Sequence, residues 1–193
     1  ESIDEAIGQA LALHPDRARM MREVEAITRA GMEGKMPFTE SVLARMKVVP
    51  LKKELLDSVG QQLLEHQTSG MRDVFDSVRS KGHNVYIVSG GFLECIAPVA
   101  QNLGVPRENI FTNRFIFDDA STAIGVDVSA PLWTNEGKTP VLRHYGEQNP
   151  GTVRIMIGDG YNDLRAYENG AAEQFIGYGE HAVREAVKSK APH

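Results

Sequence analysis

Cysteine and long apolar runs are nearly absent from this sequence. A single cysteine, Cys95, occurs in the 193 residues, so no disulfide can form within them, and we expect a reducing compartment, the cytoplasm. No apolar run approaches the length of a membrane span, and the start of the sequence lacks a signal-peptide pattern. Cys95 stands in FLECIAPVA, which is typical of a packed helix, so we interpret it as a core residue rather than a nucleophile.

Positive charge is also scarce. The 21 Lys and Arg are outnumbered by 26 Asp and Glu, which gives a net charge of -5, and no basic cluster stands out. This balance disfavours a nucleic-acid-binding protein. With 41% hydrophobic and 24% charged residues, the composition is ordinary for a globular protein with a sizeable core. The length suits one domain, or a core domain with a small insert.

Residues 1–66 are predicted to be helical throughout. Apolar residues recur at helical spacing, and breaks are expected at His14–Asp16, at Gly31 or Gly34, and at Pro50. The expected helices are one from Ser2 to the first break, one striped by residues 20–30, a short one after Thr39, and one over residues 51–67. No strand signal precedes Val85, so this part is predicted to be a small helical bundle.

Residues 67–193 have a different pattern, in which short apolar runs closed by glycine alternate with helical segments. The expected strands cover residues 84–88, 109–117, 153–157 and 174–177. The expected helices cover residues 71–81, 92–103, 137–145, 163–168 and 181–188, with a polar, turn-rich connection running up to Trp133. Strands that alternate with helices predict an α/β fold with a doubly wound parallel sheet.

Two of the predicted strands end in small polar turns, VYIVSGG and IMIGDG. In a parallel sheet both turns lie at the same edge, so Ser89, the Gly90 N–H and Asp159 are expected to converge there. A hydroxyl and a glycine N–H suit a phosphoryl oxygen, and a carboxylate suits Mg²⁺. Lys138 opens a predicted helix, where its charge opposes the helix dipole unless an anion is near.

Simpler interpretations of these residues exist. Ser89 is also a good helix N-cap, and Lys138 is also a good solvated surface charge. Asn162 or Asp163 can cap the helix that follows Asp159. On the stretch RIMIGDGYNDL alone, a strand–turn–helix with a capping residue explains the pattern as well as a catalytic site does.

Together these motifs resemble the haloacid dehalogenase-like phosphatases, and within them the phosphoserine phosphatases. Ser89–Phe92 is similar to the second motif of that family, Lys138 to the third, and Gly158–Asp163 to the fourth. The resemblance extends to three further segments, which are Glu1–Glu5, Gly31–Arg45 and Phe111–Arg114. It implies a Rossmann-like hydrolase core over residues 67–193 with an inserted helical cap over residues 1–66.

The resemblance also implies roles for individual residues in a Mg²⁺-dependent reaction on O-phosphoserine. Ser89, Gly90 and Lys138 would hold the phosphoryl group, Asp159 would bind Mg²⁺ with support from Asp163, and Asn162 would lie near the phosphate. Glu1 would bind the substrate amine, Arg45 its carboxylate, and Met32 and Phe38 would line the pocket. Without the resemblance, Arg45 is better interpreted as a surface charge, and Met32 and Phe38 as core.

The first motif of that family, DxDxT, does not occur in residues 1–193. It supplies the aspartate nucleophile and the general acid/base, and the resemblance places it upstream of Glu1, on a central strand. Without that strand, buried backbone groups on both neighbours would lose partners, at about 1–3 kcal/mol each. Three explanations are open: flanking residues complete a normal enzyme, another chain donates the strand, or a relative without the nucleophile binds phosphoserine-like ligands. The bundle and the sheet edge are each candidate homodimer interfaces.

Overall fold

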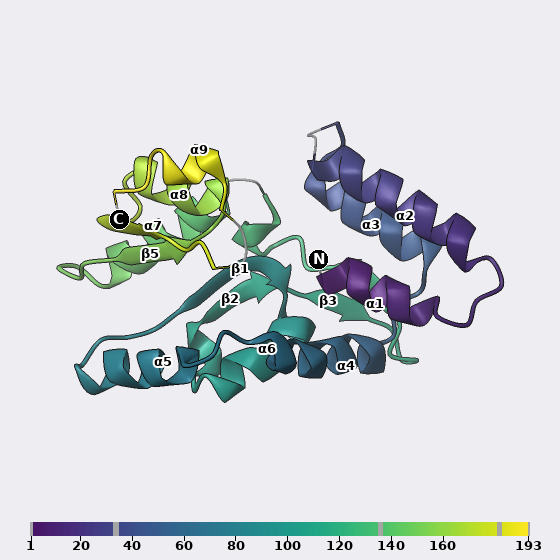
Figure 1. Cartoon of the computed structure of the whole chain (residues 1–193), viewed down its shortest axis with the longest axis horizontal. Coiled ribbons are helices and arrows are strands. Elements are labelled where there is room, and N and C mark those ends of the chain that lie inside the picture. The colour runs from purple at the N-terminus through teal and green to yellow at the C-terminus, as the bar shows by residue number, and fades with distance from the viewer. Residues whose placement is uncertain (1, 33–34, 135–136, 181–182, 193) are drawn as a thin grey trace. The chain divides into compact units, whose positions relative to one another are not determined.

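The structure, a computed structural model, describes residues 2–32, 35–134, 137–180 and 183–192 (Figure 1). The chain divides into two compact units, Glu1–Trp133 and Thr134–His193, which we call the first and second unit. The predicted boundary between cap and core, at residue 66, falls inside the first unit. A cap that acts as a separate domain therefore stays a prediction.

The helices of the first unit pack in pairs (Figure 1). α2 (Arg17–Met32) packs along α3 (Phe38–Val48), α1 (Ser2–Ala10) packs on α4 (Lys53–Leu63), and α4 packs on α6 (Leu93–Asn102). A Cβ at Gly60 of α4 would lie 2.9 Å from the Glu94 carbonyl oxygen of α6, so only glycine permits this approach. A 3₁₀ turn, Leu64–His66, and α5 (Met71–Ser80) follow α4.

The first unit contains one parallel and one antiparallel strand pair. β1 (Ile87–Phe92) leads through α6 to a 3₁₀ turn, Arg107–Asn109, and then to β2 (Ile110–Asn113), which pairs with β1 in parallel. This β–α–β unit confirms the predicted alternation. β3 (Phe115–Phe117) and β4 (Ala123–Val126) pair antiparallel, and a 3₁₀ turn, Pro131–Trp133, closes the unit.

A continuous apolar core joins the helices α1–α4 to Phe92 of β1 and to the strands β3 and β4. Phe92, at the end of β1, stacks on Phe115 with ring centroids 3.9 Å apart and meets Trp133 edge-on at 6.2 Å. Cys95 is fully buried, as predicted for a core residue, and its Sγ lies 3.7 Å from the Leu56 carbonyl oxygen. The core therefore anchors the segment on both sides of the β1–α6 junction.

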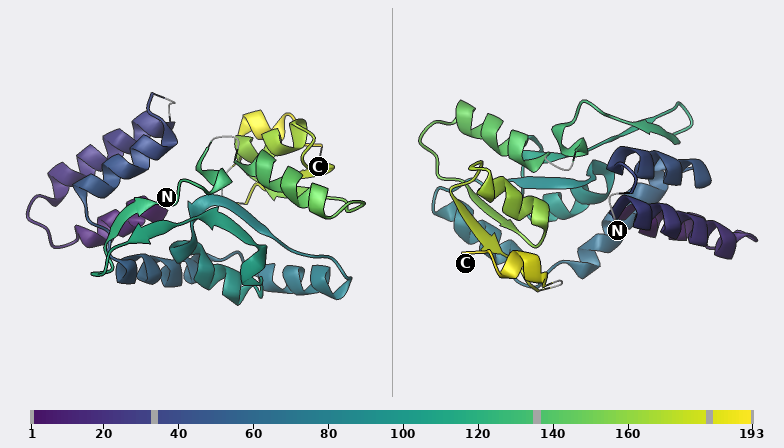
Figure 2. Two further views of the ribbon diagram at one scale, coloured as in Figure 1. Left: turned by 180° about the vertical axis from the view of Figure 1, so that it is seen from behind. Right: turned by 90° about the horizontal axis from the view of Figure 1, so that it is seen from above.

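The second unit is a further β–α–β arrangement with a helix before it and one after it (Figure 2). α7 (Lys138–Gln148) precedes β5 (Ile155–Gly158), α8 (Tyr161–Glu168) connects β5 to β6 (Gln174–Gly177), and α9 (Glu185–Lys188) comes last. β5 and β6 pair in parallel, from Ile155 opposite Gln174 to Gly158 opposite Gly177. Met156, Leu164 and Phe175 are buried in the core of this unit.

Several boundaries differ from the sequence-based prediction; β5, for example, begins at Ile155 rather than at residue 153, and α8 at Tyr161 rather than at residue 163. β1 begins at Ile87, not Asn84, and stays extended through Ser89-Gly90-Gly91, because these residues form an irregular part of its pairing with β2. Residues 109–117 form two strands in different sheets, and β4 lies in the segment predicted to be only turns. Leu51 and Lys52 are extended and bond to the β4 region, so α4 begins only at Lys53.

No helix among the described residues combines the length and the apolar character that crossing a membrane requires.

Candidate functional site

The irregular last part of β1, which we call the phosphoryl-binding turn, contains Ser89 and Gly90. The Ser89 hydroxyl oxygen accepts a hydrogen bond from the Gly91 N–H at 3.1 Å, so Ser89 folds back on its own turn. A Cβ at Gly91 would lie 2.9 Å from Cδ1 of Ile96, the end of a flexible side chain, so this contact alone does not require glycine. Ser89 is not the N-cap of α6, since the helix begins at Leu93 with Phe92 before it. The backbone of Ser89 and Gly90 is therefore extended and lies before the first residue of α6.

The connection from β5 to α8 is organised around Asp163. One oxygen of its carboxylate accepts the Gly160 N–H at 2.9 Å and so caps the first turn of α8. A Cβ at Gly158 would lie 2.3 Å from the Asp163 carboxylate, so the strand must end in glycine for this side chain to fit. Of the two predicted capping residues, Asp163 is therefore the one that bonds the N-terminus of α8, while Asn162 is exposed.

Lys138 and Asp163 form an ion pair across the second unit. Their side chains are 21% and 6% exposed, so neither is a free surface charge. The carboxylate explains the cation at the first residue of α7, where the helix dipole alone disfavours it. The structure thus brings together the predicted third and fourth motifs.

Asp159 follows β5 and lies at its carboxyl end. Its carboxylate pairs with the Arg184 guanidinium, which also donates to the Asp159 carbonyl oxygen at 3.2 Å. Mg²⁺ prefers carboxylate oxygens and commonly uses one or two of them, with water and substrate phosphate completing its shell. Asp159 fits that donor role, and the described residues contain no cluster of three or more His, Cys, Asp or Glu arranged for a metal.

Arg45, predicted to bind a substrate carboxylate, lies in a buried network of the first unit. Its side chain is 7% exposed, its Nη1 donates to Asp4 at 2.7 Å, and its Nε donates to the Ser41 carbonyl oxygen at 3.2 Å. The Thr28 hydroxyl lies 3.2 Å from the same Asp4 oxygen. The interpretation of Arg45 as a surface charge is therefore wrong, and its guanidinium is held by Asp4.

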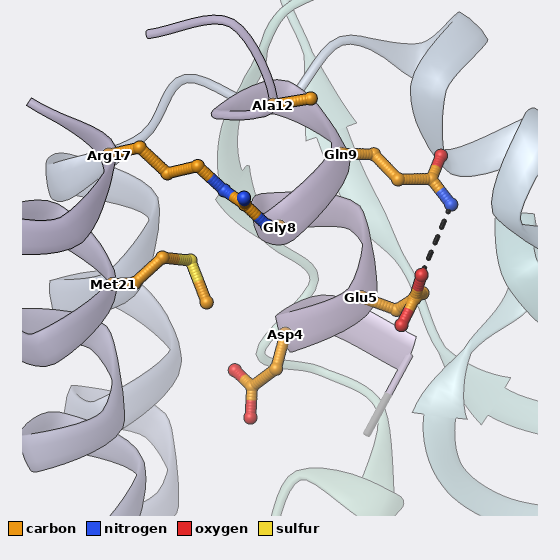
Figure 3. A pocket seen from close by; sticks show the side chains of 7 residues that line it. All are labelled: Asp4, Glu5, Gly8, Gln9, Ala12, Arg17 and Met21. Carbon is orange, nitrogen blue, oxygen red and sulfur yellow. Dashed lines mark hydrogen bonds between the residues drawn. The ribbon is translucent and has the colours of Figure 1, made fainter. Parts of the chain in front are cut away.

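Asp4 also lines an open groove of about 630 Å³ between α1 and α2 (Figure 3). Its carboxylate and the Met21 side chain point into the groove, and Arg17 extends from α2 toward Gly8 of α1. None of the predicted substrate-binding residues is among the described residues that line this groove. Glu1 lies outside the described residues, as do the side chains of Met32 and Phe38, so their predicted roles are untested.

The predicted site residues fall into two groups. Ser89, Gly90 and Arg45 belong to the first unit, whereas Lys138, Asp159, Asn162 and Asp163 belong to the second. Their convergence on one substrate stays a prediction. Sequence reasoning missed the partners Asp4 and Arg184, because a contact between distant segments leaves no local pattern.

Polar turns at the ends of parallel strands in β–α–β units define a Rossmann-like α/β protein with its candidate site at the strand ends. The sequence model of the family described as haloacid dehalogenase-like hydrolase matches residues 3–168. The chain belongs to this family.

Relatives within the family are named phosphoserine phosphatases. The chain is 32% identical over 164 residues to the chloroplastic phosphoserine phosphatase of Arabidopsis thaliana, covering 85% of this chain and 56% of that relative. It is 30% identical over 168 residues to the phosphoserine phosphatase of Mus musculus, covering 87% of this chain and 74% of that relative. The chain thus spans between about half and three quarters of these relatives.

A solved structure supports the fold. The crystal structure of a phosphoserine phosphohydrolase-like protein from Francisella tularensis matches with a TM-score of 0.80 at 30% identity, covering 100% of this chain and 87% of that one. The predicted fold class, a Rossmann-like α/β hydrolase core, is confirmed.

Proposed function

We propose that this chain is the greater part of a Mg²⁺-dependent phosphomonoester hydrolase whose substrate is O-phosphoserine. The observation that carries the proposal is the Lys138–Asp163 ion pair beside Asp159 at the end of β5, in a chain about 30% identical to phosphoserine phosphatases. A half-buried lysine and a strand-end carboxylate would supply the positive charge and the metal ligand that phosphoryl transfer requires.

Asp159 would hold Mg²⁺, which when bound supplies charge neutralisation to a phosphate ester. Asp163 would support the site without binding the metal directly, since its two carboxylate oxygens are already engaged by Lys138 and the Gly160 N–H. Ser89 and the Gly90 backbone would donate to phosphoryl oxygens, and Asn162, exposed on α8, would lie near the phosphate. Arg184 would have to leave the Asp159 carboxylate for the metal to bind there.

The nucleophile would be an aspartate of a DxDxT motif upstream of Glu1, acting through an aspartyl-phosphate. Two observations support a missing strand. Among the described residues, β1 pairs only with β2 and β5 only with β6, so each keeps an edge without a partner. On β5, Ile155 and Ile157 are 50% and 57% exposed, which is unusual for an apolar strand.

The alternative is a relative or fragment that binds phosphoserine-like ligands without turnover. It keeps Ser89, Gly90 and Lys138 as an anion site and needs no nucleophile. A cytoplasmic location and a homodimer also stay predictions, and the plant relative is named as chloroplastic.

The test is phosphate release from O-phosphoserine by the full-length polypeptide, with its intact mass measured first. We expect Mg²⁺-dependent release in the unmodified protein and a loss of about 100-fold or more in kcat for Lys138→Ala. The control is Lys188→Ala, which removes a lysine with a 67% exposed side chain from the same unit. Saturable phosphoserine binding without release would favour the alternative, and full activity in Lys138→Ala would refute the assigned role.

A further inference from the structure

The pairing of β1 with β2 is interrupted at the candidate phosphoryl-binding turn. Ser89 lies opposite Thr112, and the next pair is Phe92 with Asn113. Gly90 and Gly91 are therefore two extra residues on β1, with no residue opposite them. A bulge of two glycines has little conformational preference of its own, because glycine accepts a wide range of backbone angles.

The Asn113 side chain compensates for this interruption. Asn113 is fully buried, and its Nδ2 donates to the Gly90 carbonyl oxygen at 2.8 Å and to the Leu132 carbonyl oxygen at 3.4 Å. Its Oδ1 is buried and has no hydrogen-bond partner among the described residues. An unsatisfied buried acceptor destabilises a folded protein, so the placement of this asparagine calls for an explanation.

A continuous connection runs from Asn113 to the Ser89 hydroxyl. The Gly90 carbonyl that Asn113 holds and the Gly91 N–H belong to one planar peptide unit. That N–H donates to the Ser89 Oγ at 3.1 Å. Fixing the carbonyl therefore fixes the direction of the N–H, which in turn orients the serine hydroxyl.

We propose that Asn113 is the positioning residue of the phosphoryl-binding turn. It acts through the Gly90–Gly91 peptide and sets the orientation of the Ser89 hydroxyl, without contacting the substrate itself. The inference rests on the proposed function, because it assigns a purpose to the same site. It also gives a role to the segment Phe111–Arg114, which the sequence singles out without explaining it.

The chain provides a matched control at the other end of the same strand. Asn109 also uses its Nδ2 to bond a backbone carbonyl, that of Val85, at 3.0 Å. Val85 precedes β1, so this bond ties the two segments together away from the turn. Both asparagines have a structural role, but only Asn113 contacts the glycines.

The test compares Asn113→Asp, Asn113→Ala and Asn109→Ala in the full-length polypeptide. Asn113→Asp keeps the shape but places an acceptor against the Gly90 carbonyl, so we expect kcat/KM for phosphoserine to fall about 10–100-fold. The loss should shrink as the pH is lowered, because the protonated carboxyl can again donate. The kcat/KM of Asn109→Ala should stay within about threefold of that of the unmodified protein, because the lost hydrogen bond does not hold the turn.

A second readout separates this inference from the proposed function. Inorganic phosphate should raise the melting temperature of the unmodified protein and of Asn109→Ala, and raise it less in the Asn113 variants, each compared with itself without phosphate. If phosphoserine is not hydrolysed at all, the proposed function fails and this shift alone decides the inference. Equal losses in the Asn109 and Asn113 variants, or no phosphate shift in any of them, would overturn it. Should Asn113→Asp not fold, Asn113→Ala carries the same comparison, because it also removes the Nδ2 donor.

Discussion

Individual side chains in this protein are held by partners that come from distant parts of the sequence. Arg45 is bonded to Asp4, Lys138 to Asp163, and Arg154 to Glu173. The three pairs differ in exposure, and exposure sets what each contributes. An exposed pair contributes at most about 1 kcal/mol, whereas breaking a buried one leaves an uncompensated charge.

The role of Arg45 can be separated from its packing by the choice of substrate. Arg45→Ala should lower kcat/KM for phosphoserine about 10–100-fold, since a charged hydrogen bond contributes about 1.5–3 kcal/mol. Turnover of phosphoethanolamine, which lacks the carboxylate, should change much less. Arg19→Ala is the control, because Arg19 has a 66% exposed side chain. Equal losses on both substrates would mean that Arg45 only supports the fold through Asp4.

The pair of Glu173 with Arg154 leads to a prediction about stability at low pH. Its hydrogen bonds with Arg154 lower the pKa of Glu173 from 4.5 to about 2. Folding lowers the pKa of this carboxyl, so its stabilising effect is complete when the pH is above the pKa in the unfolded chain. The effect is lost as the pH falls to the pKa in the folded protein. The melting temperature of Glu173→Gln should therefore lie below that of the unmodified protein at neutral pH, and the gap should close between about pH 4.5 and 2.

The control for this pair is Glu185→Gln, since the Glu185 side chain is 83% exposed and 3.9 Å from Lys188. Its melting temperature should follow that of the unmodified protein at every pH. A gap for Glu173→Gln that is constant with pH would contradict the prediction.

Among the elements, the β5–α8 connection depends on contacts with its neighbours. Gly158 ends the strand, Gly160 precedes the helix, and Asp163 bonds back to it within one turn. The same Asp163 pairs with Lys138 at the start of α7. The Asp163 carboxylate thus contacts the end of β5, the start of α8 and the start of α7, so a change in any of these elements affects its position.

Gly158→Ala tests this dependence. The added Cβ would overlap the Asp163 carboxylate at 2.3 Å, so the side chain must move away from Lys138 and the Gly160 N–H. We expect a loss of about 1–3 kcal/mol in the free energy of unfolding, measured by denaturant titration, together with reduced activity. Gly125→Ala in β4, where no atom lies within 4 Å of the added Cβ, should be nearly neutral. Similar effects of the two substitutions would argue against crowding as the cause.

Over the whole molecule, the two parallel strand pairs share one property. In the part of the chain that the structure describes, each pair consists of two strands and keeps an unpaired edge. On β5, Ile155 and Ile157, which lie on one face of the strand, are also exposed. Exposed apolar strand edges promote association with other chains, and natural proteins usually cover them.

A polypeptide limited to residues 1–193 should therefore self-associate and bind a hydrophobic dye, unlike one that also carries the proposed DxDxT strand. Ile157→Lys should reduce both effects, because a charge at an edge strand disfavours pairing. Val74→Lys is the control, since Val74 is 54% exposed and lies on the helix α5 rather than on a strand. Sedimentation velocity would measure the association, and a monomer that binds no dye would refute the prediction.

Much of this architecture could be predicted from the sequence, and the failures have physical reasons. The bounds of β6 are as predicted, because an apolar run closed by glycine is a local signal. Lys138 as the first residue of α7 is also confirmed. The β3–β4 hairpin was missed because its strands are short, and Ser121 at its turn adopts a positive φ of 56° that its residue type does not indicate.

The candidate site was predictable in part for the same reason. The motifs around Ser89 and Asp159 stand in contiguous segments, so the sequence indicated them. The contacts that hold them, Asn113 with Gly90 and Asp159 with Arg184, join segments 23 and 25 residues apart. Such pairings depend on how the chain packs, which no local pattern records.

The Lys138–Asp163 pair also affects the entropy of ligand binding. A free lysine side chain loses about 2 kcal/mol of rotamer freedom when it is immobilised. In this protein the ammonium is already restrained by Asp163 before any anion arrives, so that ordering takes place during folding. An anion that binds at Lys138 would therefore meet a preorganised charge, and its affinity would not be reduced by the cost of ordering the lysine.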